Sequence, residues 1–229
     1  MADVEDGGYA ERVTTEVENL IPVPDGVGTR EALALLHDGA GALMVFDRAG
    51  VRPGATVLVQ PAAGGLGSGL VQLAGAAGAR VIGAARGARK LQVVEGLGAD
   101  LVVDYSAPGW IDQVGGVDVV FDGVGGDLGR AVFDLVRSGG TYSNYGFAGG
   151  GFTEIDRDEA ARREVTVIGM EQLVEGRPHR RAWARRVLEE AAAGRIHPVI
   201  GQTYPLEQAA EGHAALENRD TIGKTLLLT

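Results

Sequence analysis

The chain contains no cysteine, which excludes disulfide bonds, thiolate metal sites and a cysteine nucleophile. Histidine is also scarce: the four histidines are scattered and show no metal-binding spacing, so we expect no metal site. Basic residues number 21 against 31 acidic ones, and the net charge of −10 disfavours binding to nucleic acid. A phosphate ligand would therefore need a local basic pocket.

Long apolar runs are missing too, and none approaches the ~20 residues of a membrane-spanning helix. The first eight residues, MADVEDGG, are acidic and polar, unlike a signal or transit peptide, so we expect a cytoplasmic protein without membrane contact. Glycine, by contrast, supplies 37 of 229 residues, about twice the usual share. These glycines have no collagen-like period, so they indicate turns, helix ends and close backbone approaches.

The middle of the chain alternates short apolar segments with helical ones, which is the βαβ pattern. We expect helices at residues 68–77, 88–97, 109–116 and 127–136. We expect strands at residues 56–60, 79–85, 100–105, 117–126, 139–147 and 164–170. Six mostly apolar strands with short crossovers predict an α/β fold, a doubly wound, parallel six-stranded Rossmann sheet.

The two ends of the chain have a different pattern. Residues 1–29 alternate like a strand and end in Pro-x-Pro, and a helix is expected over 29–49. After a long helix at 179–194, the tail reads as a short strand (HPVIGQTYP), a helix and a final strand (KTLLLT). Both ends therefore predict β-structure outside the main sheet, which suggests a small second domain built from the two termini.

The motif with the clearest chemistry follows the first strand of the sheet. Residues 62–67 match the G-x-G-x-x-G dinucleotide fingerprint with alanine in its first position. Gly64 would let the backbone approach a pyrophosphate, and Gly67 would let the following helix pack against the strand. The alternative is a glycine-rich turn of some other α/β fold. The expected contacts are Ala63, Gly64, Gly65, Leu66 and Gly67.

The second strand indicates which dinucleotide is bound. Proteins that bind NAD place an acid near its end to accept from the ribose 2′-hydroxyl. Here the strand is followed by Arg86, Arg89 and Lys90, with no acid among them. Cations suit a 2′-phosphate, so NADPH is favoured over NADH. The alternative is that these three side chains form a solvated charge cluster.

Several segments in this order resemble the zinc-independent quinone oxidoreductases of the medium-chain dehydrogenase/reductase (MDR) superfamily. They are GGYAERV, LLHDGAGAL, AAGGLGS, the basic turn at 86–90, GADLVVDY, VDVVFDGVGG and TIGKTLLL. The resemblance implies a Rossmann domain with NADPH beside a GroES-like substrate domain, most of which has no counterpart here. It implies three parts: a GroES-like remnant (1–29), the NADPH-binding domain (30–175), and a C-terminal helix that returns to the GroES-like part (176–229).

The resemblance also assigns roles to individual residues. It implies that Lys90 and Tyr105 hold the 2′-phosphate and that Val124 touches the cofactor. It places Tyr145, Gly146 and Phe147 beside the nicotinamide. It also implies that the terminal Gly-Lys segment with Lys224 closes on the cofactor. Tyr105 could instead be a packed strand-end aromatic, and Phe147 a loop hydrophobe. The chain departs from the family at Gly41, where a threonine often faces the cofactor.

The chemistry implied is hydride transfer to a quinone or an α,β-unsaturated carbonyl (enone), with no metal required. The catalytic residues are not identified; His37, Asp38 and Tyr145 are candidates, and an ordinary helix histidine is the favoured reading of His37. Other hypotheses are a non-catalytic NADPH-binding protein, a subunit completed by a partner chain, and a cropped fragment. The sixth strand lies at a sheet edge, which predicts a homodimer.

Overall fold

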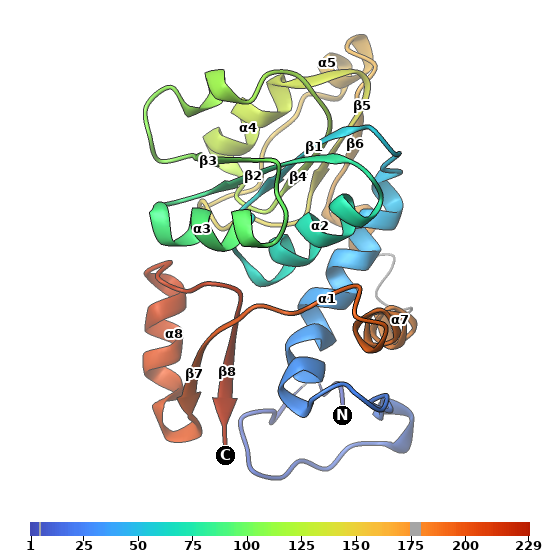
Figure 1. The fold of residues 1–229 in the computed structure, drawn as a ribbon, viewed down its shortest axis with the longest axis vertical. Helices are drawn as coiled ribbons and strands as arrows, with labels where there is room; N and C mark the ends of the chain where they lie inside the picture. Colours follow the sequence, from blue (N-terminus) through green and yellow to red (C-terminus); the bar gives the residue numbers. More distant parts are fainter. Residues whose placement is uncertain (5, 175–179) are drawn as a thin grey trace.

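The computed structural model describes residues 1–4, 6–174 and 180–229 (Figure 1). Its main part is a six-stranded parallel sheet in the order β3-β2-β1-β4-β5-β6, which confirms the predicted fold class. All six predicted strands are present, with bounds shifted by a few residues. They are β1 (Thr56–Gln60), β2 (Arg80–Ala85), β3 (Leu101–Asp104), β4 (Val117–Asp122), β5 (Val136–Asn144) and β6 (Thr166–Ile168).

Helices cover both faces of this sheet (Figure 1). On one face, Val57 and Val59 of β1 pack with buried residues of α1 (Thr29–Ala49), α2 (Gly65–Ala76) and α3 (Ala88–Gly96). On the other face, Leu58 of the same strand packs with α4 (Gly126–Asp134), the 3-10 helix η2 (Trp110–Gln113) and α5 (Arg157–Arg162). Because strand residues point alternately to the two faces, a continuous apolar strand suits a sheet that is covered twice.

Helix α1 links the sheet to the lower part of the molecule (Figure 1). The Gly28 N–H donates to Glu31 Oε2 (3.0 Å) at its start, and Gly50 ends it in the left-handed conformation (φ 64°). Its buried residues face α2 on one side and α7 (Arg180–Ala192) on the other, where Val187 and Leu188 are fully buried. The site described below is arranged around this helix.

The C-terminal segment forms a second, small sheet of two parallel strands, β7 (Ile200–Pro205) and β8 (Lys224–Leu228). The 3-10 helix η4 (Leu206–Gln208) and α8 (Ala209–Glu217) connect the two strands. In Figure 1 this unit lies below the main sheet and beside α1. The predicted strand, helix and strand at the end of the chain are therefore confirmed.

The strand expected within residues 1–29 is not formed. Among the described residues of this segment, regular structure is limited to the 3-10 helix η1 (Val17–Asn19) and one bridge between Ala2 and Leu20. The alternating residues belong to neither sheet, because β7 and β8 pair with each other and not with this segment. Tyr9 and Val17 remain 62% and 75% exposed. The second sheet therefore comes from the C-terminal segment alone.

Two short helices were not expected from the sequence: α5 and α6 (Met170–Val174). Asp156 caps α5, because its carboxylate accepts from the Asp158 N–H (2.9 Å). The long helix expected from residue 179 is α7; residue 179 itself, like the boundary proposed between 175 and 176, lies outside the described residues.

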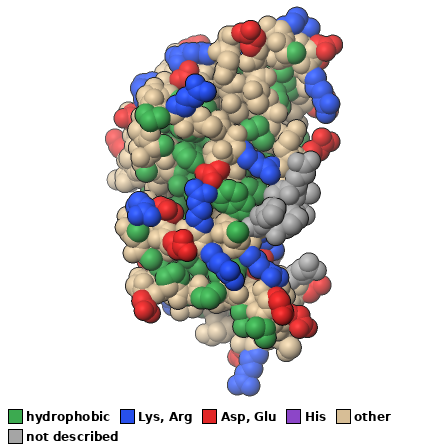
Figure 2. Space-filling model, turned by 90° about the vertical axis from the view of Figure 1, so that its right-hand side faces the viewer, with side chains coloured by type: hydrophobic (Ala, Val, Ile, Leu, Met, Phe, Trp, Pro, Cys, Tyr) green, Lys and Arg blue, Asp and Glu red, His purple; other side chains and the backbone are tan. Residues whose placement is uncertain are grey.

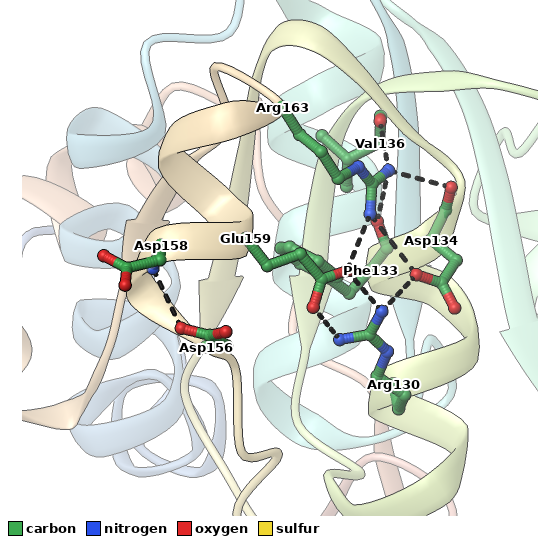
Figure 3. A network of polar contacts seen from close by, with 8 residues as sticks. All are labelled: Arg130, Phe133, Asp134, Val136, Asp156, Asp158, Glu159 and Arg163. Atoms are coloured by element: carbon green, nitrogen blue, oxygen red, sulfur yellow. Dashed lines mark hydrogen bonds and ion pairs between the residues drawn. The ribbon is translucent and has the colours of Figure 1, made fainter.

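An ion-pair network fastens α5 to the end of α4 (Figure 3). Arg130 contacts both Glu159 (2.6 Å) and Asp134 (2.7 Å), while Arg163 donates to the carbonyl oxygens of Asp134 (3.0 Å) and Val136 (2.9 Å). The two guanidinium groups also lie over the Phe133 ring, 5.0 and 4.7 Å from its centroid. Arg163 thus supplies donors to carbonyl groups that a helix end leaves unpaired.

Candidate functional site

The glycine-rich turn between β1 and α2 lies at the carboxyl edge of the main sheet, where the strand order reverses between β1 and β4. Helix α2 starts at Gly65, and its first N–H groups have no acceptor within the helix, so they can bind an anion. A Cβ on Gly67 would lie 2.1 Å from the Pro61 carbonyl oxygen. The close packing expected at Gly67 is therefore present.

The C-terminal segment contacts this turn directly. The Gly223 N–H donates to the Ala63 carbonyl oxygen (2.7 Å), and Gly64 and Gly223 form a parallel bridge. Lys224, the first residue of β8, is thereby placed next to the glycine-rich turn, where its ammonium lies 3.2 Å from Asp38 Oδ1. The structure thus brings together the terminal Gly-Lys pair and the turn, which are about 160 residues apart in the sequence.

A cluster of cations lies where β2 and β3 end. The charges of Arg86 and Arg219 act on both Lys90 and Tyr105, and the Lys90 ammonium donates to the Arg219 carbonyl oxygen (2.5 Å). Partial burial and the neighbouring Arg86 lower the pKa of Lys90 against the opposing charge of Asp220, and burial raises the pKa of Tyr105. Arg89, the other cation predicted to bind the phosphate, is exposed on α3, and its charge is not among those that act on Lys90 or Tyr105. Its role in phosphate binding stays a prediction.

Sequence reasoning missed Arg219, which reaches this cluster from the loop between α8 and β8. The residue has a left-handed backbone (φ 60°), which is uncommon outside glycine and places the chain in a sharp turn. Arg219 follows Lys90 by 129 residues in the sequence, so no local motif connects the two. The only available signal was a basic residue just before the terminal Gly-Lys segment.

Asp104, at the end of β3, holds the basic turn in place. Its carboxylate accepts from the Gly87 N–H (3.0 Å) and from the backbone and hydroxyl of Ser106 (2.9 and 2.6 Å). Hydrogen bonds from Ser106 above all keep the pKa of Asp104 below its ordinary value. This acid therefore binds backbone groups of the turn that carries Arg86.

A fully buried carboxylate, Asp122, lies at the carboxyl end of β4. Its Oδ1 accepts from Gln60 Nε2 and from the N–H groups of Val124 and Gly125. Its Oδ2 accepts from Tyr142, Asn144 and Thr153. These six distances run from 2.6 to 3.2 Å. Several donors can stabilise a buried charge, so Asp122 ties together the ends of β1, β4 and β5.

The loops after β4 and β5 are paired with each other above Asp122. The Ala148 N–H donates to the Gly123 carbonyl oxygen (3.1 Å), and the Gly149 N–H to that of Val124 (2.6 Å). Tyr145 lies over Gly123, since a Cβ there would be 2.4 Å from its ring, and its hydroxyl donates to the Gln60 carbonyl oxygen (3.2 Å). The predicted contacts after the fourth and fifth strands thus lie at one edge of the sheet.

The other predicted residues of this edge differ in exposure. Val124 is buried, and the Gly146 carbonyl oxygen accepts from Asn144 (3.0 Å). Phe147 is 56% exposed and packs against Phe152, with ring centroids 4.8 Å apart. It is therefore a surface side chain in this structure, and nothing in its packing directs it toward the glycine-rich turn.

An apolar cavity of about 280 Å³ lies between α1, the start of α2, the loop after β5, α6 and α7. Figure 2 shows hydrophobic side chains gathered near mid-height on the face of the molecule seen from the right of Figure 1, with basic and acidic groups beside them. Leu66 of the glycine-rich turn and Tyr145 both line the cavity. The other lining residues include His37, Gly41, Met170 and Trp183. No sequence pattern indicated this cavity, because its walls come from five separate elements.

Asp38 of α1 lies against the glycine-rich turn. A Cβ on Gly65 would be 2.0 Å from its carboxylate, so the glycine allows Asp38 to approach the turn this closely. Besides Lys224, Asp38 Oδ1 contacts His37 Nδ1 at 3.4 Å. Burial alone would raise the pKa of Asp38, but His37 and Lys224 outweigh it and hold this pKa below its ordinary value.

Comparison with known proteins places this architecture in a family. The model of a family described as zinc-binding dehydrogenase matches residues 97–227. Quinone oxidoreductase-like protein 2 of Bos taurus is 33% identical over 96% of this chain and 66% of its own length. The quinone oxidoreductase of Thermus thermophilus, solved also with NADPH, is 33% identical with a TM-score of 0.79, covering 99% of this chain and 76% of that one.

The chain therefore belongs to the MDR superfamily and is quinone oxidoreductase-like, which confirms the resemblance. A structure described as an NAD-dependent alcohol dehydrogenase is also similar, with 34% identity and a TM-score of 0.81 over 97% of this chain and 65% of that one. The chain spans about two thirds of the length of the first curated relative.

The residues present fit a dinucleotide. The open N–H groups of α2 suit a pyrophosphate, and three cations at the ends of β2 and β3 suit a further phosphate. Within the described residues there is no group of three or more histidine, cysteine or acidic side chains that could hold a metal ion. No helix in the described part of the chain is both long and apolar enough to cross a bilayer.

Proposed function

We propose that this chain binds NADPH and acts as a zinc-independent oxidoreductase on a quinone or an α,β-unsaturated carbonyl. The observation that carries the proposal is the cation cluster of Arg86, Lys90 and Arg219 beyond the glycine-rich turn. NADH has no group to neutralise these charges, whereas NADPH has its 2′-phosphate. The relatives named quinone oxidoreductase support the choice of acceptor.

The cofactor would supply the hydride, and the chain would supply position and electrostatics. The α2 N-terminus would hold the pyrophosphate, and the cation cluster the 2′-phosphate. The paired loops that Asp122 fixes would form the wall beside the nicotinamide, and the apolar cavity would exclude water from the acceptor. A quinone or enone is already electrophilic, so this arrangement requires no metal.

The test is a fluorescence titration of the purified chain with NADPH and NADH, followed by NADPH oxidation with a panel of quinones and enones. Tighter binding of NADPH, with turnover of at least one acceptor, supports the proposal. Equal affinities for the two cofactors would contradict the 2′-phosphate site. NADPH binding without turnover would instead support the second hypothesis, a non-catalytic NADPH-binding protein or a subunit completed by another chain.

We further propose a homodimer in which β6 joins the same strand of a second copy. In this structure β6 is an edge strand that pairs with β5 alone among the described strands. An edge presents unpaired backbone groups that a second strand can satisfy. Light scattering that gives a monomer mass at every concentration would contradict this assembly.

A further inference from the structure

The apolar cavity has an ionisable group at its edge that the proposed binding of NADPH does not use. His37 lines the cavity together with Leu66 of the glycine-rich turn and Tyr145 of the loop after β5. A ligand ring in the cavity would thus contact both predicted cofactor segments and the His37 imidazole. The His37 side chain is 70% exposed, so solvent can also reach it.

His37 is the outer member of a row of three charged or ionisable groups. Its Nδ1 lies 3.4 Å from Asp38 Oδ1, and the same oxygen lies 3.2 Å from the Lys224 ammonium. Asp38 is 20% exposed, lies against Gly65 and accepts a hydrogen bond from Lys224, so it is held beside the glycine-rich turn. A carboxylate at one ring nitrogen orients an imidazole and balances its positive charge, leaving Nε2 to act.

The other groups near the cavity are poor sources of a proton. The Tyr145 hydroxyl already donates to the Gln60 carbonyl oxygen, and burial raises the pKa of this tyrosine. Arg180 lines the cavity, but a guanidinium does not release its proton in proteins. Tyr9 and His213 are hydrogen-bonded to each other (2.9 Å) in a neighbouring groove, which His37 and Lys224 also line, and neither of the two lines the cavity.

We propose that His37 is the proton donor of the reduction, with Asp38 and Lys224 as positioning residues. This inference rests on the proposed function. The acceptor gains a hydride on carbon or oxygen, and its carbonyl oxygen takes the proton from Nε2 of the His37 imidazolium. The net change is one acceptor, one NADPH and one proton converted to the reduced acceptor and NADP⁺. Water returns the proton to the exposed ring.

The experiment compares NADPH oxidation by 2-methyl-1,4-naphthoquinone in the whole chain and in three variants. His37→Ala should lower kcat about 100-fold, the lower range for a general acid, with the Kd for NADPH unchanged within twofold. Added imidazole should restore part of this kcat. Asp38→Asn should lower kcat less, since the imidazole remains. His213→Ala, a histidine of the neighbouring groove that does not line the cavity, should leave both kcat and imidazole response unchanged.

A second measurement does not depend on turnover. In the NMR spectrum, addition of NADP⁺ and then 1,4-naphthohydroquinone should shift the His37 ring resonance and leave that of His213 in place. An unshifted His37 signal would overturn the proposal. So would a His37→Ala variant that keeps its kcat, or one that loses only NADPH affinity, and in both cases the proposed oxidoreductase function would stand. Absence of turnover in the unchanged chain would overturn both.

Discussion

The two ends of the candidate site are built in opposite ways. The end near β2 and β3 is charged and largely exposed, and its cations come from the turn before α3, from α3 itself and from the loop before β8. The end near β4 and β5 is buried, and one carboxylate, Asp122, accepts six hydrogen bonds there. The charged end can therefore be changed without unfolding the protein, whereas the buried end combines stability and positioning.

Asp122→Asn should have the largest effect on stability. It tests whether the buried end depends on one charge. An asparagine presents an amide NH₂ to groups that are themselves donors, so at least one set of partners loses its acceptor. We expect a loss of about 3–5 kcal/mol in the free energy of unfolding, measured by urea denaturation. Asp127→Asn, an exposed acid in the first turn of α4, is the control and should cost less than about 1 kcal/mol.

A pair of glycine variants separates folding from binding within the turn. A Cβ on Gly67 would meet backbone atoms of Pro61 and Ala62 at 2.1–3.1 Å, so Gly67→Ala should cost about 1–3 kcal/mol. A Cβ on Gly64 would have an ordinary contact of 3.4 Å, so Gly64→Ala should keep its stability. It should nevertheless weaken NADPH binding, because the new methyl group crowds the expected pyrophosphate. Unchanged NADPH affinity in Gly64→Ala would contradict that placement.

At the charged end, single substitutions should change selectivity and leave stability nearly constant. Arg86→Ala, Lys90→Ala and Arg219→Ala should each weaken NADPH binding about tenfold, or ~1.4 kcal/mol, with little change for NADH. Arg89→Ala is the comparison variant, because the charge of Arg89, unlike those of Arg86 and Arg219, is not among those that act on Lys90. Both cofactors would be titrated against each variant. An equal loss for NADPH and NADH would show that the cations do not bind the 2′-phosphate.

The contrast between the two ends also explains what the sequence could predict. The strand and helix pattern and the glycine-rich turn are local, so the Rossmann sheet and residues 63–67 followed from short segments. Asp122 gave no such signal, because its side-chain partners Tyr142, Asn144 and Thr153 are 20 to 31 residues away. Arg219 was missed for the same reason.

The N-terminal segment shows the opposite error, because a strand was expected there and is not formed. Its alternating apolar residues favoured a strand, but alternation produces a strand only where a neighbouring edge can pair with it. Pro22 and Pro24 lack the N–H that such pairing needs, and Tyr9 and Val17 remain exposed. A pattern of period two was therefore insufficient evidence for β-structure without an edge.

The smallest effect should come from the network that joins α4 and α5, which lies beyond the end of α4 opposite the paired loops. Arg163→Met keeps an apolar side chain on Phe133 but removes the donors to the Asp134 and Val136 carbonyl groups. The expected cost is about 1 kcal/mol or less, with an unchanged Kd for NADPH; Arg162→Met, on the exposed side of α5, is the control. Weaker NADPH binding in Arg163→Met would show that α5 positions the loop before it, and that the buried end extends further than Asp122 and its direct partners.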